Sequence, residues 1–261
     1  MLNNMYKIII ENNFSEIHIR YLKEHHRLFI KINSLFWLII SLLFIFSLVK
    51  SKEPFLDKIK QKAYFTPNTY RIAFVFGTRP EAIKLFPLIK EIKKNKNFVC
   101  IIINTGQHRE MIKQILESFN LDNSIDFNLD IMKSNQSLAK ITSSSISKLE
   151  KIFNLINPNA VVVQGDTTTG FSAAISAFYQ KIPVFHVEAG LRTHNFSYPY
   201  PEEFNRITID DISTLFFAPT EWAANNLLKE NKNSKNIFVT GNTIVDSLKL
   251  NLYASLKMFV K

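Results

Sequence analysis

Cysteine is almost absent from this sequence of 261 residues, in which Cys100 stands alone. A single cysteine excludes an intramolecular disulfide, and the sequence has no cysteine and histidine spacing typical of a metal site. Cys100 lies in the apolar run Phe98–Ile103, a position that predicts a small buried core residue. This cysteine usage fits a reducing, cytoplasmic setting, and we predict no bound metal.

Glycine is also scarce, with six residues in the whole chain, where a typical protein has about 7%. All six follow residue 70, and four of them, Gly77, Gly106, Gly165 and Gly241, come directly or within two residues after an apolar run. In open α/β sheets ligands bind beyond the carboxyl ends of the strands, where glycine permits tight turns. The glycines therefore predict that this rim of the sheet is the active face. The sequence lacks a G-x-G-x-x-G fingerprint, so a nicotinamide cofactor is not predicted.

Acidic residues are outnumbered, with 22 Asp and Glu against 32 Lys and Arg, which gives a formal net charge of +10. The first 69 residues are the most densely basic part, with 10 Lys and Arg against 5 Asp and Glu. Basic residues beside an apolar segment suit an anionic membrane surface, although a composition rich in lysine and asparagine needs no partner at all. No basic stripe interleaved with aromatic residues is present, so we predict no nucleic-acid partner.

One long stretch near the N-terminus lacks charge altogether, from Ile32 to Val49. Its length is at the lower edge of a membrane span, Lys31 and Lys50 bracket it, and Trp37 lies near one end. We therefore predict a membrane helix at 32–49, within an N-terminal extension and linker at 1–69. The alternative is a buried or amphipathic helix, or an extension without function.

From residue 70 onward, short apolar runs alternate with segments of helical length and periodicity. Strands are predicted at 70–76, 98–104, 160–164, 184–188, 215–219 and 237–240, and helices near 80–95, 108–119, 136–156, 168–180, 202–212, 220–230 and 243–258. Apolar strands without polar alternation are typical of a parallel sheet that is covered on both faces. The pattern predicts a Rossmann-like, doubly wound α/β domain.

The segment FGTRPEAIK, Phe76–Lys84, joins the first predicted strand to the first predicted helix. Thr78 can cap that helix, and Pro80 suits its first turn. The N–H groups of the helix N-terminus together with Arg79 predict a site for a phosphate or a developing oxyanion, and Lys84 follows just over one turn later. A capped helix with solvated Arg79 and Lys84 is the alternative.

Two further motifs follow strands on the same rim. In TGQHREM, Thr105–Met111, the side chains of Gln107 and His108 are predicted to face the rim, although a histidine at a helix start is often a cap or a surface residue. In VVVQGDTTTG, Asp166 follows the strand and Gly165, where it would serve as a helix cap or, if buried near other carboxylates, as a base.

The last motif, VFHVEAGLRTHNFSYPYPEEFNR, places Glu188 at the end of a strand and Glu202 at the start of a helix after a proline-rich loop. Glu202 and Arg206 are four residues apart on one face of that helix, which also fits a surface ion pair. Asp166, Glu188 and Glu202 would form three carboxylates on one rim. Clustered carboxylates raise one another's pKa, and this suits proton transfer at carbon.

These motifs resemble those of the non-hydrolysing UDP-N-acetylglucosamine 2-epimerases. The resemblance runs from about Arg71 to the end of the chain and includes, in order, FGTRPEAIK, TGQHREM, QGDTTT, HVEAGLRT, PEE-x-NR, APTEWAANNLL and TGNTIVD. It implies the N-terminal domain of a GT-B-like fold with two facing Rossmann-type domains. It also implies an isomerase that interconverts UDP-GlcNAc and UDP-ManNAc by elimination and re-addition of UDP, without a cofactor.

The resemblance also assigns roles to residues. Proton transfer at the sugar falls to the three carboxylates Asp166, Glu188 and Glu202. Binding of the substrate falls to Arg79, Lys84, Arg206, Gln107 and His108, of which the last two match a segment near a second, regulatory UDP-GlcNAc.

The family pattern has a second α/β domain of about 150 residues, and this sequence matches only the first. We expect an epimerase domain at 70–242, a crossover helix at 243–261, and either a truncated enzyme or one half of a split enzyme with a separately encoded C-terminal half. On that expectation the chain alone is inactive, and a complete enzyme is a homodimer that serves polysaccharide biosynthesis at the cytoplasmic face of the plasma membrane. The alternatives are an inactive, membrane-anchored or partner-binding remnant, and half of a GT-B sugar-nucleotide transferase.

Overall fold

The computed structural model describes residues 69–106, 125–131 and 135–250. The predicted membrane helix at 32–49, the predicted helix at 108–119, and Gln107 and His108 lie outside these residues. Within the described ranges, none of the helices is both long enough and apolar enough to cross a membrane.

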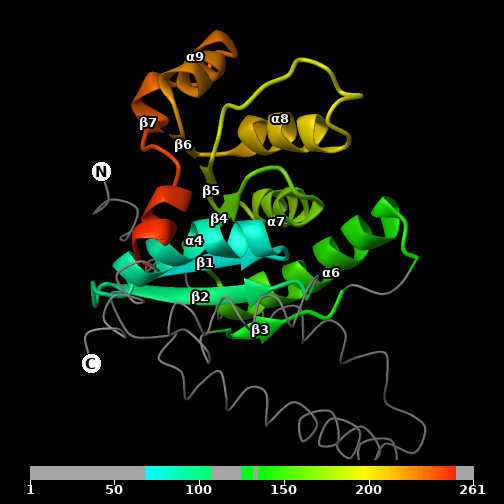
Figure 1. Ribbon diagram of the computed structural model, residues 1–261. Helices are drawn as coiled ribbons and strands as arrows, with labels where there is room; N and C mark the ends of the chain where they lie inside the picture. The colour runs from blue at the N-terminus through cyan, green and yellow to red at the C-terminus, as the bar shows by residue number, and fades with distance from the viewer. Residues whose placement is uncertain (1–68, 107–124, 132–134, 251–261) are drawn as a thin grey trace, which may run out of the picture. The chain divides into compact units, whose positions relative to one another are not determined.

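A seven-stranded parallel sheet forms the centre of the described domain (Figure 1). The strands are β1 (Tyr70–Phe76), β2 (Phe98–Asn104), β3 (Phe127–Asn128), β4 (Ala160–Gln164), β5 (Val184–Val187), β6 (Leu215–Ala218) and β7 (Ile237–Val239). The strand order is β3-β2-β1-β4-β5-β6-β7, and every neighbouring pair is parallel. This is the order of a doubly wound Rossmann-like sheet, as predicted.

Helices follow the strands in turn. They are α4 (Arg79–Ile92), α6 (Leu138–Ile156), α7 (Thr168–Tyr179), α8 (Glu202–Ile212) and α9 (Glu221–Lys229), with a short 3-10 helix η1 (Ser234–Asn236). Residues 244–250 are also helical, inside the range predicted for the crossover helix. The six strands and these helices agree with the prediction to within a few residues, whereas the two-residue edge strand β3 was not predicted because it is too short to form a pattern.

The sheet is covered on both faces, and β1 shows why its sequence reads as a continuous apolar run. Ile72, Phe74 and Phe76 pack with Leu85, Phe86 and Ile89 of α4 in one buried cluster. Ala73 and Val75, which point to the opposite face, are also fully buried. Both sets of alternating side chains in β1, one on each face of the sheet, are therefore apolar and buried.

Cys100 of β2 is half-buried. The prediction that it contacts the core is confirmed, but the prediction that it is buried is wrong. Its side chain packs against the buried cluster that residues of β1 and α4 form. Burial raises the pKa of the thiol to about 11, partly opposed by the charge of Lys93.

The strand order reverses direction between β1 and β4, with β2 on one side and β5 on the other. In such sheets the crevice at the carboxyl ends of the strands beside this reversal is where ligands bind. The segments that leave β1, β4 and β5 therefore meet at one edge, and they carry the motifs FGTRPEAIK, QGDTTT and HVEAGLRT.

Candidate functional site

The turn between β1 and α4 is organised by a buried carboxylate, that of Glu81. Its Oε2 accepts hydrogen bonds from the backbone N–H of Gly77 at 3.0 Å and of Thr78 at 2.8 Å, and from the Thr78 hydroxyl at 2.8 Å. The N–H groups of Gly77 and Thr78, which precede the helix, are thus already occupied by a carboxylate of the same turn. Arg79, the first residue of the helix, is exposed and has no ion pair with the described residues, so it remains available for an anion.

Glu81 also connects this turn to the next one. Its Oε1 accepts a hydrogen bond from the Thr167 hydroxyl at 2.6 Å, and Thr167 is the residue after Asp166. The Glu81 side chain is completely buried, and burial raises the pKa of its carboxyl, although hydrogen bonds from Thr167, Gly77 and Thr78 oppose the shift. The two turns that follow β1 and β4 are therefore tied together beneath the rim.

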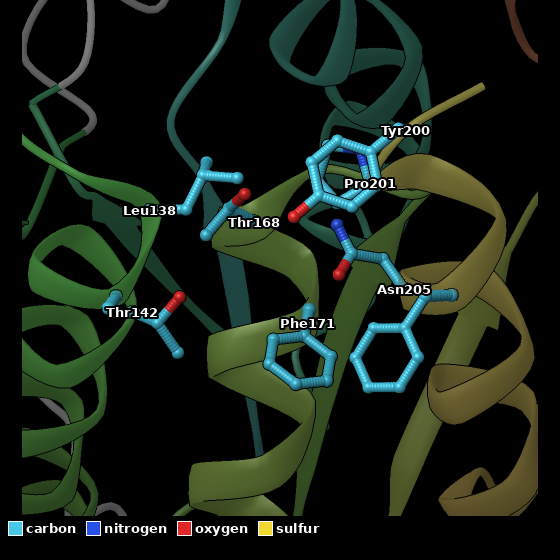
Figure 2. A pocket seen from close by; sticks show the side chains of 9 residues that line it. Leu138, Thr142, Thr168, Phe171, Tyr200, Pro201 and Asn205 are labelled. Carbon is cyan, nitrogen blue, oxygen red and sulfur yellow. The ribbon is translucent and has the colours of Figure 1, made fainter. Parts of the chain in front are cut away.

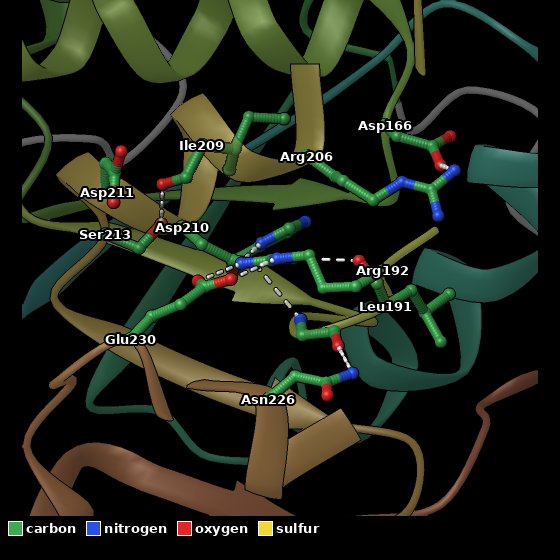
Figure 3. A network of polar contacts seen from close by, with 12 residues as sticks. Asp166, Leu191, Arg192, Arg206, Ile209, Asp210, Asp211, Ser213, Asn226 and Glu230 are labelled. Carbon is green, nitrogen blue, oxygen red and sulfur yellow. Dashed lines mark hydrogen bonds and ion pairs between the residues drawn. The ribbon is translucent and has the colours of Figure 1, made fainter. Parts of the chain in front are cut away.

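Asp166 follows the carboxyl end of β4, where two side chains of α8 contact it. Its Oδ2 forms an ion pair with Arg206 Nη2 at 2.6 Å, and its backbone carbonyl accepts from the side-chain amide of Asn205 at 2.9 Å. Figure 3 shows the carboxylate and the guanidinium pointing toward one another. Arg206 therefore pairs with Asp166 and, three residues back, with Glu203 at 3.5 Å, rather than with Glu202 as the helical spacing suggested.

The pKa of the Asp166 carboxyl is raised, mainly by burial. The neighbouring carboxylates of Glu202 and Glu188 raise it further, while the charges of Arg206 and His186 lower it. A carboxyl that exchanges its proton closer to neutral pH is suited to general acid and base work. Glu202 and Glu188 are thus close enough to Asp166 to affect the protonation of its carboxyl.

Glu188 follows β5 and adopts a left-handed backbone conformation with φ of 71°, which is unusual for a residue with a side chain. Its Oε2 accepts hydrogen bonds from Lys84 Nζ at 2.5 Å and from the side-chain amide of Gln164. Its Oε1 accepts from the side-chain amide of Asn242 at 2.9 Å. Strained backbone of this kind concentrates at functional sites, where the surrounding contacts hold it in place.

The loop before α8 is held by a second buried carboxylate, that of Glu203. Its Oε1 accepts from the backbone N–H groups of Thr193 at 2.9 Å and His194 at 2.7 Å. The adjacent Glu202 is partly exposed at the first position of α8, with its side chain free of ion pairs to the described residues. Glu203 therefore has the structural role, and this leaves Glu202 available at the rim.

Below the rim lies a buried network of charged side chains (Figure 3). Asp210 Oδ1 contacts His186 Nδ1 at 2.6 Å, and its Oδ2 contacts Arg192 Nη1 at 2.8 Å. Arg192 also donates to both oxygens of Glu230, at 2.7 and 2.6 Å. Arg192 lies in the loop that follows β5, and its side chain is fully buried because two carboxylates compensate its charge.

His186 extends this network to the turn that carries Asp166. Its Nε2 lies 2.8 Å from the carbonyl oxygen of Gly165, the residue before Asp166. Both ring nitrogens therefore lie beside oxygen atoms, a carboxylate on one side and a carbonyl on the other. The carbonyls of Gly165 and Asp166 are thus held by His186 and Asn205, which fixes the turn that carries Asp166.

An apolar pocket of about 310 Å³ adjoins the rim between the starts of α6, α7 and α8 (Figure 2). Its lining residues are Leu138, Ala139, Thr142, Thr168, Phe171, Tyr200, Pro201, Phe204 and Asn205. No carboxylate and no basic side chain lines it. The cluster of Asp166, Glu188, Lys84 and Arg206 is therefore the better candidate for catalysis.

The structure brings together the predicted residues Asp166, Glu188, Glu202, Lys84 and Arg206. Sequence reasoning missed Glu81, Gln164 and Asn242, which contact these residues or the turns that carry them. The pattern Thr78-x-x-Glu81 is a capping-box signature and could have singled out Glu81. The part of the chain that the structure describes contains no group of three or more side chains able to hold a metal ion.

Fold and site together define a Rossmann-like α/β domain that carries two carboxylates paired with cations, those of Asp166 and Glu188, at its topological switch point. Residues 90–259 match the profile of the UDP-N-acetylglucosamine 2-epimerase family, and the chain belongs to that family. A putative UDP-N-acetylglucosamine 2-epimerase of Clostridium acetobutylicum is 50% identical over 178 residues, which are 68% of this chain and 46% of that protein. The UDP-N-acetylglucosamine 2-epimerase of Bacillus subtilis is 51% identical over the same length and the same shares.

Solved structures agree with these relatives. The UDP-GlcNAc 2-epimerase of Neisseria meningitidis, in a crystal structure bound to UDP-GlcNAc, superimposes with a TM-score of 0.68 at 48% identity. The match covers 70% of this chain and 49% of that one. The chain therefore spans about half the length of the relatives it matches, and its domain has the fold of a GT-B-type epimerase.

Proposed function

We propose that this chain supplies one wall of the active site of a non-hydrolysing UDP-N-acetylglucosamine 2-epimerase. The reaction removes the proton at C2 of the sugar while the bond between C1 and the UDP oxygen breaks, which leaves a 2-acetamidoglucal. UDP then re-adds at C1, and C2 is protonated on the opposite face to give UDP-ManNAc. Two faces of one carbon need two separate proton carriers, and the rim offers several carboxylates.

The observation that carries the proposal is the pairing of the carboxylates. Asp166 and Glu188 each have a basic partner of their own, Arg206 at 2.6 Å and Lys84 at 2.5 Å. The two carboxylates are thus held by different helices, α8 and α4, and can act as separate proton carriers. In this proposal Asp166, Glu188 and Glu202 carry the protons.

Substrate binding is proposed for the basic residues around this cluster. Arg79, exposed at the start of α4, and the cations Lys84 and Arg206 would balance the negative charge of the substrate. From the motif TGQHREM we add Gln107 and His108 to the binding residues.

The test combines the full chain with the part of a relative that this chain does not match. The chain is co-expressed with the C-terminal half of the Bacillus subtilis epimerase, and conversion of UDP-GlcNAc to UDP-ManNAc in D2O is followed by NMR. We expect UDP-ManNAc to form with deuterium at C2. Asp166→Asn and Glu188→Gln should each abolish it, while Glu150→Gln, on the exposed face of α6, should not. Turnover that persists in both site variants would contradict the carboxylate assignment.

For the organisation of the chain we propose an epimerase domain at 70–242, a crossover segment at 243–261, and an N-terminal extension at 1–69 that is anchored to the inner face of the plasma membrane through 32–49. The helical residues 244–250 support the crossover segment. Cell fractionation tests the anchor. Recovery of the full chain entirely from the soluble fraction would exclude it.

A further inference from the structure

The two oxygens of the Glu188 carboxylate are held in different ways. Among the described residues, Oε2 has two donors, Lys84 of α4 and Gln164 at the end of β4, whereas Oε1 has one, the side-chain amide of Asn242 at 2.9 Å. A carboxylate held at one oxygen can still rotate about its last bond, and a donor on the second oxygen prevents this. Asn242 therefore sets the plane of the Glu188 carboxylate.

The orientation of the Asn242 amide is itself fixed by the start of the helix at 244–250. Its Oδ1 accepts from the backbone N–H of Ile244 at 3.1 Å, so its Nδ2 is the atom that faces Glu188. Gly241, at φ of 77°, turns the chain just before this point. The amide thus has one end in a helix cap and the other on the carboxylate, and only an amide can supply both an acceptor and a donor here.

The helix that begins after Asn242 rests on α4, which carries another donor to Glu188. The Ser247 hydroxyl donates to the carbonyl oxygen of Ile83 at 2.5 Å, and Leu250 packs against the cluster beneath α4. Ile83 is the residue before Lys84. Two donors to Glu188, Lys84 and Asn242, therefore come from segments that contact each other through this hydrogen bond and this apolar packing.

We propose that Asn242 is a positioning residue for Glu188: the segment that follows β7 aims the carboxylate through the Asn242 amide. This inference rests on the proposed function, in which Glu188 carries a proton. It extends the candidate site to a segment that neither the predicted site residues nor the carboxylate motifs include.

Kinetics of the co-expressed enzyme separate positioning from helix capping. Asn242→Ser keeps an oxygen for the N–H of Ile244 but cannot reach Glu188, whereas Asn242→Ala removes both contacts. A hydrogen bond to a charged group is worth enough to lower kcat by about 10- to 100-fold, and both variants should show this loss with an unchanged KM for UDP-GlcNAc. Asn233→Ser, which alters the exposed cap of η1, is the matched control and should retain the kcat of the unmodified enzyme. If Asn242→Ser retained it as well, Asn242 would be a cap only.

The pH profile gives a second readout that a structural role would not move. Asn242→Asp keeps the acceptor for Ile244 but sets a carboxylate against Oε1 of Glu188, and two acceptors repel each other unless they share a proton. We expect its activity relative to the unmodified enzyme to rise as the pH falls from 8 to 6. A ratio that stays constant with pH would overturn the proposal.

An arm that needs no activity keeps this test independent of the proposed function. In the full chain alone, the side-chain amide signal of Asn242 in a 15N NMR spectrum should move in the Glu188→Gln variant. The amide of Asn205, which is bonded to a backbone carbonyl, should stay in place. An unmoved Asn242 signal would refute the contact. A moved signal in an assembled enzyme without epimerase activity would refute the proposed function and leave the contact standing.

Discussion

The buried carboxylate of Asp210 offers the sharpest test of how the site is supported. Its side chain has no solvent exposure, and its oxygens meet His186 Nδ1 at 2.6 Å, Arg192 Nη1 at 2.8 Å and the Gly190 N–H at 3.1 Å. Asp210→Asn keeps the shape but replaces one oxygen with an amide donor and removes the charge. Removal of one partner from a buried ion pair costs about 3–5 kcal/mol, because the remaining charge stays buried.

In a domain of this size, 1 kcal/mol corresponds to about 2–4 °C, so the Tm should fall by about 6–20 °C. Urea unfolding followed by far-UV circular dichroism gives the free energy directly. The neighbouring Asp211→Asn is the matched control, since that side chain is 60% exposed and has one ion pair, with Lys232 at 2.6 Å. An exposed pair contributes at most about 1 kcal/mol. If the two variants unfolded within about 1 kcal/mol of each other, the buried network would not be a support of the site.

The pH dependence of this difference has a definite sign. Burial pushes the pKa of Asp210 upward, but the charges of His186 and Arg192 and the hydrogen bonds from both outweigh it, so the pKa lies below its usual value of 3.8. A carboxyl with a lowered pKa in the folded state stabilises the protein above its unfolded pKa, and this stabilisation is lost as the pH falls through the folded pKa. The deficit of Asp210→Asn should therefore be complete at pH 7 and shrink only below about pH 4.

Two further predictions concern single residues. In Gly190→Ala the new Cβ would lie 2.2 Å from the carbonyl oxygen of Ala223, at φ of 83°, whereas in Gly241→Ala, at φ of 77°, no atom lies within 4 Å. Urea unfolding should show a loss of about 1–2 kcal/mol for Gly241→Ala and about 2–5 kcal/mol for Gly190→Ala, and equal losses would contradict the contact. Cys100, with a pKa of about 11, should react with iodoacetamide at pH 8.5 about 100-fold more slowly in the folded chain than in urea, and its rate should rise as the pH approaches 11. A folded rate within tenfold of the unfolded rate would contradict the burial of the thiol.

The sequence predicts the sheet well because its strands are buried on both faces. Runs such as Ala160–Gln164 contain only residues that pack on either side, and their ends coincide with those of β4. The edge strand Phe127–Asn128 has no such run and is defined only by its pairing with β2. A strand that is defined by its hydrogen bonds to a neighbouring strand, and not by an apolar run of its own, cannot be predicted from the sequence.

The places of Asp166 and Glu188 were predictable, because each directly follows a strand or the glycine after it. The ion-pair partners of the charged residues were not predictable, because residues far apart in the sequence become neighbours only in the folded chain. Arg206 has Glu202 at helical spacing, yet it pairs with Asp166, 40 positions away in the sequence. Arg192 looks like a solvated loop residue until Glu230 and Asp210 are seen around it. Long-range pairing of charges decides which carboxylate is structural and which is free to act.

Thr167 provides the test of whether the two turns of the rim act as one unit. It is the N-cap of α7, where it accepts from the Gly170 N–H at 3.0 Å, and it also donates to Glu81 at 2.6 Å. Thr220 is the N-cap of α9 and accepts from the Ala223 N–H at 3.1 Å, without a second partner among the described side chains.

Valine has the shape of threonine without its hydroxyl, so Thr220→Val should cost about 1 kcal/mol for the lost cap. Thr167→Val loses the same cap and also a hydrogen bond to a buried carboxylate, worth about 1.5–3 kcal/mol more. Urea unfolding of both variants measures the difference. An excess near zero for Thr167→Val would mean that Glu81 does not join the turn after β1 to the turn after β4. The position of Asp166 would then depend on α8 and His186 alone.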